Sequence, residues 1–291
     1  MRRLYLAFLL LLATTAFAQR DFSKVEVKAT KVAGSVYMIV GAGGNIGVSV
    51  GDDGIVMIDD QYAPLAPKIE AALKAITDKP VRFIINTHYH GDHTGGNEHF
   101  GKSAPIVAHE NVRKRLSTTN TRLGTTTPPA PAAALPVLTF DHTVTIHLNG
   151  EDVRAVHMPH GHTDGDAVIW FTKSNVVHMG DDFFNGNFPF VDRENGGSVK
   201  GLIANIDHVV STVPDDAKII PGHGPLSDKA GLRSFGTMLK ETVAAVQAGI
   251  TAGKTAEQLK SEKVLAAWDS WGTGFIKNDT WVDTIYGELK N

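Results

Sequence analysis

A dense group of side chains that can bind a metal ion lies between positions 86 and 97. Three histidines and one aspartate occur there in the order His-x-His-x-Asp-His: His88, His90, Asp92 and His93. Neutral imidazole and carboxylate are ligands that a borderline cation such as Zn²⁺ takes. In an extended segment His88 and His90 point to one side, because side chains alternate with a period of two, so they can share one ion. Asp92 and His93 follow a glycine, where the chain can turn towards a second ion.

An apolar segment directly precedes this group and must hold it in place. Residues 81–85 follow a Lys-Pro breaker and are predicted to form a buried strand. The chain contains 13 histidines, so an isolated histidine means little, and a polar turn rich in histidine by chance is the alternative interpretation. Four potential ligands in this order at a strand end favour a metal site. Because the chain has no cysteine, its ligands must come from His, Asp, Glu and water.

Three further motifs follow predicted strands in the second half of the chain. They are Gly-His-Thr around His162, Gly-Asp at Asp181 and Pro-Gly-His-Gly around His223. Each motif alone is weak evidence for a ligand, but all three follow the histidine cluster in a fixed order along the chain. In that order they resemble the signature of the metallo-β-lactamase superfamily, from about Val32 to Pro225.

This resemblance implies a dinuclear metal centre. His88, His90 and His162 would hold one ion, and Asp92, His93 and His223 would hold the other. Asp181 and a water-derived hydroxide would bridge them. The implied cofactors are two Zn²⁺, with iron or manganese as alternatives. Such ions lower the pKa of bound water to about 7 and generate a nucleophile. Asp92 would orient that hydroxide and relay a proton, and is the predicted catalytic residue.

Several neighbouring residues are alternatives to this ligand set. His160 and Asp164 flank His162, and we expect them at the rim of the site or in hydrogen bonds to ligands. Asp182 is the weaker candidate beside the bridging aspartate, and His178 is expected to face back into its strand.

Asp59 follows an apolar strand and matches the family's first motif. It is predicted to orient a ligand through a hydrogen bond, and a simple strand cap is the alternative.

Strands and helices alternate along the chain, which predicts an α/β fold. The resemblance specifies an αββα sandwich, with two mixed sheets packed face to face and helices outside. Strands are predicted at 25–27, 36–40, 46–50, 55–58, 81–86, 106–108, 138–140, 144–148, 153–157, 168–171, 176–179 and 218–220. Helices are predicted at 64–76, 97–100, 110–116, 198–211, 227–249, 256–268 and 281–290. The Gly-rich stretch 41–44 is predicted to be a hairpin turn, since it lacks a phosphate-loop pattern.

Two segments are candidates for contacts with substrate. Residues 117–136, rich in Thr, Pro and Ala, are predicted to form a long exposed connection that serves as a lid or rim. The aromatic segment 183–190 follows Asp181, and Phe184 and Phe188 are predicted to line an apolar substrate groove. The alternative is that these rings pack in the core.

The resemblance predicts a hydrolase that opens an amide or ester carbonyl in a β-lactam or lactone-like small molecule. The bridging aspartate resembles the glyoxalase II and lactonase branches, whereas zinc β-lactamases carry Cys or Ser there. Alternatives of the same fold are a mononuclear iron dioxygenase and a non-catalytic metal-binding accessory protein. Oligomeric state is left open.

The N-terminal sequence indicates where the protein acts, and the net charge limits the partners that it can bind. Residues 1–18 combine a basic start, a short apolar run and an Ala-x-Ala site, which predicts a secretory signal peptide cleaved between Ala18 and Gln19. A single catalytic domain, 19–291, would then be periplasmic or secreted, with no stable membrane insertion. An uncleaved anchor is the alternative. The net charge of −3 gives no electrostatic case for nucleic acid as a partner.

Overall fold

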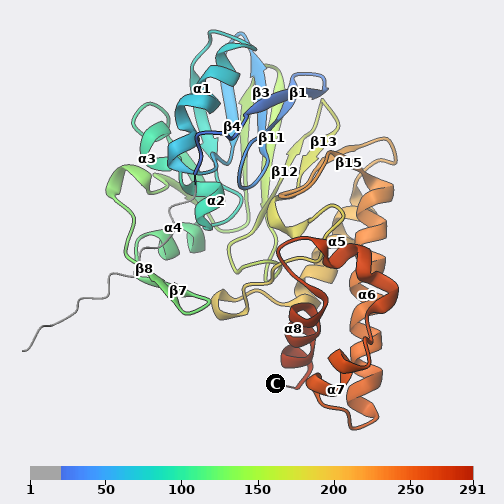
Figure 1. The fold of residues 1–291 in the computed structure, drawn as a ribbon. Helices are drawn as coiled ribbons and strands as arrows, with labels where there is room; N and C mark the ends of the chain where they lie inside the picture. Colours follow the sequence, from blue (N-terminus) through green and yellow to red (C-terminus); the bar gives the residue numbers. More distant parts are fainter. Residues whose placement is uncertain (1–20, 291) are drawn as a thin grey trace, which may run out of the picture.

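Two β-sheets face each other in the centre of the molecule, and helices cover their outer faces (Figure 1). This computed structural model describes residues 21–290. The predicted signal peptide and its cleavage site lie outside the described residues. The first sheet has the order β1-β2-β3-β4-β5-β6-β9, and the second has the order β10-β11-β12-β13-β14-β15.

The bounds of the elements are as follows. The first sheet contains β1 (Lys28–Ala33), β2 (Val36–Val40), β3 (Ile46–Gly51), β4 (Gly54–Ile58), β5 (Val81–Ile85), β6 (Ile106–His109) and β9 (Leu138–Phe140). The second contains β10 (Thr143–Leu148), β11 (Glu151–His157), β12 (Ala167–Phe171), β13 (Val176–His178), β14 (Lys218–Ile220) and β15 (Ser227–Asp228). The helices are α1 (Ala66–Lys74), α2 (Gly91–Thr94), α3 (Asn97–Phe100), α4 (Glu110–Leu116), α5 (Val199–Thr212), α6 (Lys229–Thr251), α7 (Ala256–Ser261) and α8 (Asn278–Lys290).

Alternate side chains of one strand belong to different apolar layers. In β4, Val56 and Ile58 pack between the two sheets, whereas Ile55 and Met57 pack under α1. In β12, Ile169 faces the first sheet, and its neighbour Val168 packs in the layer beneath α5 and α6. This period of two divides the apolar residues into three layers and confirms the predicted αββα sandwich.

The strands that precede the predicted ligands end at one edge of the sandwich. In the first sheet β4, β5, β6 and β9 are parallel, and in the second β13 and β14 are parallel. Parallel neighbours share an edge at their carboxyl ends, so loops that follow β4, β5, β13 and β14 meet there. The hairpin predicted at 41–44 joins the antiparallel strands β2 and β3.

Three predicted elements differ from the structure. Residues 25–27 precede β1 and form no strand. The connection 117–136 is not irregular throughout, since it contains the hairpin of β7 (Asn120–Arg122) and β8 (Thr125–Thr127). The helix predicted at 256–268 ends at Ser261, and a kinked 3₁₀ segment follows from Ala266 to Thr273. Local composition did not reveal these breaks because tertiary contacts override weak propensities.

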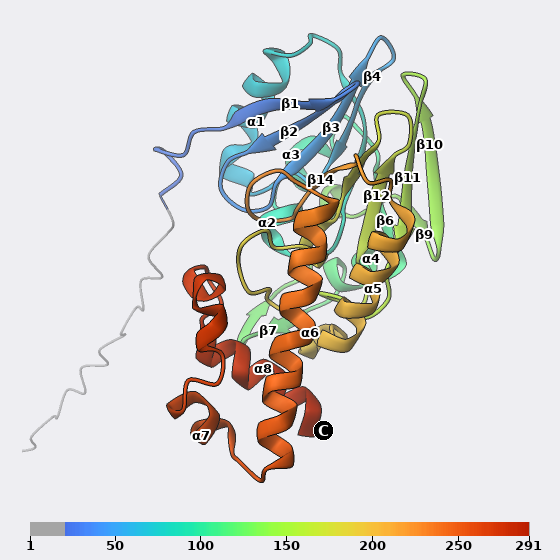
Figure 2. The same cartoon turned by 90° about the vertical axis from the view of Figure 1, so that its right-hand side faces the viewer.

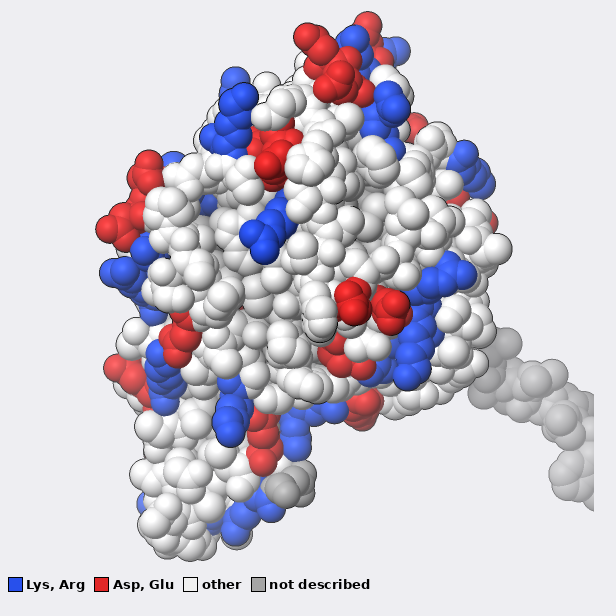
Figure 3. Space-filling model, turned by 180° about the vertical axis from the view of Figure 1, so that it is seen from behind, with Lys and Arg blue, Asp and Glu red and all other residues white. Residues whose placement is uncertain are grey.

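Helix α6 extends beyond the sheets, and α7 and α8 pack beside its far part (Figure 2). The buried Trp281 of α8 donates a hydrogen bond from Nε1 to Thr242 Oγ1 of α6, at 3.0 Å. On the face seen in Figure 3, basic and acidic side chains are interspersed. Within residues 21–290, no helix is long and apolar enough to cross a bilayer.

Candidate metal centre

Seven predicted ligands, which are spread over 136 residues, meet at the sheet edge. They form two adjoining groups. His88, His90, His162 and Asp181 make up the first group, and Asp92, His93 and His223 make up the second. In each group one ligand atom per residue lies within 4.8 Å of the others, a spacing that suits a shared metal ion.

The first group is buried and tightly convergent. His162 Nε2 lies 2.8 Å from His90 Nδ1 and 3.4 Å from Asp181 Oδ2. His88 Nε2 lies 3.8 Å from the same carboxylate oxygen.

The second group opens towards solvent. His223 Nε2 lies 3.3 Å from Asp92 Oδ2 and 3.5 Å from His93 Nε2. Asp181 reaches this group with its other oxygen, because Oδ1 lies 3.0 Å from His93 Nε2 and 3.4 Å from His223 Nε2. One oxygen of Asp181 therefore faces each group, as the predicted bridging position requires.

Hydrogen bonds outside the two groups fix four of the imidazole rings. The nitrogen that faces away from the centre has a partner in each: His88 Nδ1 with Thr87 Oγ1 (3.0 Å), His90 Nε2 with Asp192 Oδ2 (2.9 Å), His93 Nδ1 with Asp59 Oδ2 (2.7 Å) and His162 Nδ1 with the Phe190 carbonyl (2.7 Å). Such partners orient a ring and leave its other nitrogen available as a ligand.

Asp59 ends β4 and also makes hydrogen bonds to the loop that carries the histidine cluster. Besides its contact with His93, its carboxylate accepts hydrogen bonds from the Thr87 backbone N–H (2.8 Å) and hydroxyl (2.7 Å). Its φ of 61° is uncommon for a residue other than glycine, although Asp tolerates it better than most. This turn at the end of β4 aims the carboxylate at the loop after β5. The placement agrees with the role in orienting a ligand that the sequence predicted.

Unpaired buried atoms mark where a cation would fit. His88 Nε2 is buried and has no hydrogen-bond partner among the described residues. Asp181 Oδ1 is also buried without a hydrogen bond there, and its polar neighbours are the ligand candidates His93 and His223. An unsatisfied buried polar group costs free energy, and native structures rarely contain one without a reason. Both atoms point into the space shared by the two groups. An all-nitrogen-and-oxygen donor set of this kind fits zinc, iron or manganese.

Burial keeps the histidines of the first group neutral. Burial lowers the pKa of His162 to about 3, and it also lowers the pKa of His90 and His88. Neutral imidazole is the form that binds a metal.

In the second group burial also lowers the pKa of the histidines, but the neighbouring carboxylates raise it by more. Asp181 is the largest raising influence on both histidines, and the pKa of His223 rises to about 9. The pKa of His93 is also raised well above its usual value. A metal ion must displace these protons when it binds.

The neighbouring candidates lie outside both groups. His160 is exposed, and its Nδ1 donates to the Gly196 carbonyl. Asp164 forms an ion pair with Arg115. Asp182 accepts a hydrogen bond from the His162 backbone N–H.

His178 is buried, and its Nε2 donates to the Asn45 carbonyl at 2.9 Å. It occupies the core position that the sequence predicted.

A cavity of about 400 Å³ opens over the two groups. Its lining comprises Gly43, Tyr62, His90, Asp92, Arg122, Leu123, Asp181, Phe184, Phe190, His223 and Phe275. Phe184 lines this cavity as predicted and stacks on His223, with ring centroids 5.0 Å apart. The prediction for Phe188 is wrong. Its side chain is 1% exposed and stacks on Trp281, because the chain turns this ring towards α8.

Sequence reasoning missed the roles of two residues beside the ligands, Tyr89 and Asp192. Phe190 belongs to the predicted aromatic segment 183–190, lines the cavity and supplies the carbonyl partner of His162. Asp192 contacts His90, and Tyr89 donates a 2.5 Å hydrogen bond to the same carboxylate. Asp192 belongs to no motif and lies 102 residues from its partner, so only the folded chain reveals this contact. An acidic residue shortly after the aromatic segment was the one available signal.

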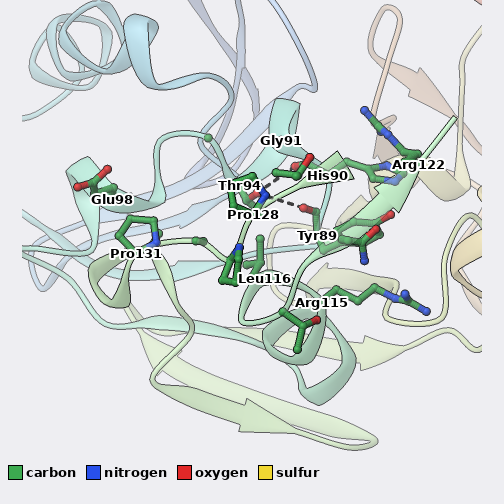
Figure 4. Close-up of a pocket in the computed structure, with 17 residues that line it drawn as sticks. Tyr89, His90, Gly91, Thr94, Glu98, Arg115, Leu116, Arg122, Pro128 and Pro131 are labelled. Carbon is green, nitrogen blue, oxygen red and sulfur yellow. Dashed lines mark hydrogen bonds between the residues drawn. The ribbon is translucent and has the colours of Figure 1, made fainter. Parts of the chain in front are cut away.

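A second pocket of about 440 Å³ adjoins the first and shares His90 and Arg122 with it (Figure 4). Arg122 lies at one end of this pocket, and Glu98 and Pro131 lie at the other. Residues 127–131 line this second pocket, so part of 117–136 lies beside the site.

The family model described as the metallo-beta-lactamase superfamily matches residues 30–223. A hydroxyacylglutathione hydrolase from Nitrosococcus oceani is 28% identical over 152 residues, which cover 51% of this chain and 50% of that protein. A metallo-beta-lactamase type 2 from Bacteroides fragilis is 20% identical over 236 residues, which cover 77% of this chain and 90% of that protein. The chain thus spans about half the length of the hydroxyacylglutathione hydrolases that it matches.

Solved structures share the fold. A metallo-beta-lactamase from Pontibacter korlensis has a TM-score of 0.59 at 18% identity, covering 74% of this chain and 99% of that chain. The sec-alkylsulfatase Pisa1 from Pseudomonas sp. has a TM-score of 0.68 at 16% identity, covering 89% of this chain and 50% of that chain.

Proposed function

This chain belongs to the metallo-beta-lactamase superfamily, and we propose that it is a dinuclear metal-dependent hydrolase that opens ester or amide carbonyls in small molecules. The observation that carries this proposal is the placement of Asp181 between two groups of ligands. Each group offers at least three donors, and one oxygen of Asp181 faces each of them.

Two such ions supply a Lewis acid for the carbonyl oxygen and activate water as a nucleophile at neutral pH. The chain's own residues position the reactants. Asp92 lines the cavity, with its side chain 20% exposed. Its carboxylate would accept a proton from the attacking water and pass it to the leaving group. Phe184 and Phe190 form an apolar wall that favours a substrate with apolar parts.

Esters, thioesters, lactones and β-lactams all contain the reacting carbonyl. Relatives named hydroxyacylglutathione hydrolase and metallo-beta-lactamase support a carbonyl substrate. The aspartate at the bridging position favours lactone and ester substrates over dedicated β-lactam hydrolysis.

We also propose that the mature protein begins at Gln19 and acts outside the cytoplasm, which N-terminal sequencing of the exported protein would test.

Metal content and turnover measured on one preparation test the function. We expect two ions per chain and hydrolysis of at least one member of a panel of lactones, thioesters and nitrocefin. Asp92→Ala should lose turnover while the circular dichroism spectrum is unchanged, and Asp207→Ala on the exposed face of α5 is the matched control. One iron per chain with oxygen uptake would indicate a dioxygenase, and full occupancy without turnover would indicate an accessory protein.

A further inference from the structure

The cavity over the metal centre contains an arginine, Arg122. Within the described range 21–290 it is the only Lys or Arg in the lining. Among residues 21–290, no hydrogen bond or ion pair is made by its guanidinium, which lies 5.8 Å from the centroid of the Phe190 ring. By contrast, the neighbouring Arg115 forms paired hydrogen bonds with Asp164. Arg115 is thus part of the scaffold, and Arg122 is free to bind a ligand.

The cavity lining combines one guanidinium with the carboxylates of Asp92 and Asp181, which both belong to the ligand groups. Those two carboxylates already lie within ion-pair distance of His93 and His223. Among residues 21–290, the Arg122 guanidinium is therefore the group in this lining that can attract an anionic part of a substrate.

The hairpin that carries Arg122 is held against the site. The Leu123 backbone N–H donates to Glu194 Oε2 at 3.2 Å, and Asn195 Nδ2 donates to the Thr121 carbonyl at 3.3 Å. Asn195 also donates to both oxygens of Asp192, so β7 and the histidine cluster share a support. This attachment holds the backbone of the hairpin beside the site, and Arg122 lines both pockets. Figure 4 shows its side chain at one end of the second pocket.

Apolar side chains at the mouth of the cavity are unusually exposed. Leu123 is 63% exposed and Phe275 is 78% exposed, and both line the cavity. Leu123 has a φ of 49° at the tip of the hairpin, a conformation that disfavours a bulky residue. Residues in such conformations concentrate at functional sites. An apolar group on the substrate would cover these two side chains.

We propose that Arg122 binds a carboxylate or a similar oxyanion of the substrate while Leu123 and Phe275 contact its apolar part. The substrate is therefore an amphipathic molecule with an anionic group. Guanidinium and carboxylate form paired hydrogen bonds in one plane, which lysine does not reproduce. This inference rests on the proposed hydrolase function and specifies its substrate class.

A matched pair of esters tests the proposal on the zinc-loaded protein. Mono-p-nitrophenyl adipate carries a terminal carboxylate, and p-nitrophenyl hexanoate is its neutral counterpart. We expect the wild type to prefer the anionic ester. Arg122→Gln should lower the ratio of the two kcat/KM values about tenfold or more, mainly through KM, and Arg122→Lys should fall between them. Arg233→Gln removes the same charge from the exposed surface of α6 and should leave the ratio unchanged.

Binding supplies a second readout. In calorimetry the carboxylate 6-phenylhexanoate should bind the zinc-loaded wild type more tightly than its neutral amide, 6-phenylhexanamide. Arg122→Gln should abolish this difference in affinity. A wild type that prefers the neutral ester, or an Arg122→Gln variant with an unchanged ratio and unchanged binding, would overturn the proposal and leave the hydrolase function intact. If the wild type hydrolyses neither ester nor any member of the panel, the hydrolase function itself fails.

Discussion

His90 Nε2 lies 2.9 Å from Asp192 Oδ2, a carboxylate that comes 102 residues later in the chain. Tyr89 and Asn195 donate to the same carboxylate, so it is held in place from three sides. With Nε2 engaged in this way, Nδ1 of His90 points towards the first ligand group. The orientation of one ligand candidate thus depends on a loop in the other half of the chain.

Replacing Asp192 should weaken metal binding without removing a ligand. We expect Asp192→Ala to lower zinc affinity by about ten- to a hundredfold, because His90 loses the partner that orients its ring. Zinc dissociation constants measured by chelator competition check this. Tyr89→Phe, which removes one of the other donors to this carboxylate, should have a smaller effect. Wild-type affinity in Asp192→Ala would show that the contact does not support the site.

Metal binding should stabilise the fold. At free zinc a hundred times the dissociation constant, a site present only in the native state adds about 2.7 kcal/mol to the free energy of unfolding. We therefore expect a lower Tm after chelation and recovery with zinc. Native mass spectrometry should find two ions per chain, and Asp181→Ala should reduce occupancy of both positions. Retention of two ions in that variant would argue against a bridging role.

Gly222 lies against Asp181 so closely that a side chain would not fit. A Cβ at this position would overlap Asp181 Oδ1 and the Gly180 carbonyl. Gly222→Ala should therefore displace the carboxylate, lower metal content and reduce Tm. Gly91→Ala is the control in the same region, since nothing lies within 4 Å of its added Cβ. Equal metal content in both variants would contradict this packing argument.

Acidification should destabilise the protein through a stacked histidine pair outside the metal centre. The rings of His109 and His157 are 3.7 Å apart, at an interplanar angle of 11°. His109 Nδ1 accepts the Asn111 backbone N–H at the start of α4, which only a neutral ring can do. Burial and the neighbouring His157 lower the pKa of His109 to about 4, while Asp164 and Asp141 oppose this shift without overcoming it.

Proton linkage gives the direction in which stability changes with pH. The unfolded chain binds more protons at His109, so stability is lost as pH falls from about 6.5 towards the folded pKa. His109→Asn keeps an oxygen that can cap α4 but does not titrate. Urea unfolding of the metal-free protein should therefore show a smaller change in stability between pH 7 and pH 5 for this variant than for the wild type. Parallel pH curves for the two proteins would rule out this contribution.

Local sequence determined most of the elements and the identity of the ligand candidates. Residues 97–100, 110–116, 138–140 and 218–220 have the bounds predicted from apolar pattern and breakers. The cluster His88 to His93 could be recognised because its ligands are neighbours in the chain. The distant candidates each follow a predicted strand, but they could be recognised only because their motifs occur in the order of the family signature.

The tertiary structure decided what depends on contacts between distant segments. The partners of the histidines, such as Asp192, carry no local pattern, since any loop aspartate looks alike before the chain folds. Phe184 and Phe188 occur in one aromatic run, yet one ring lines the cavity and the other packs on Trp281. The chain alone determined which chemistry is available, because ligand type is a property of single residues. Burial, ring orientation and the unpaired charge of Arg122 arise only when segments distant in sequence pack together.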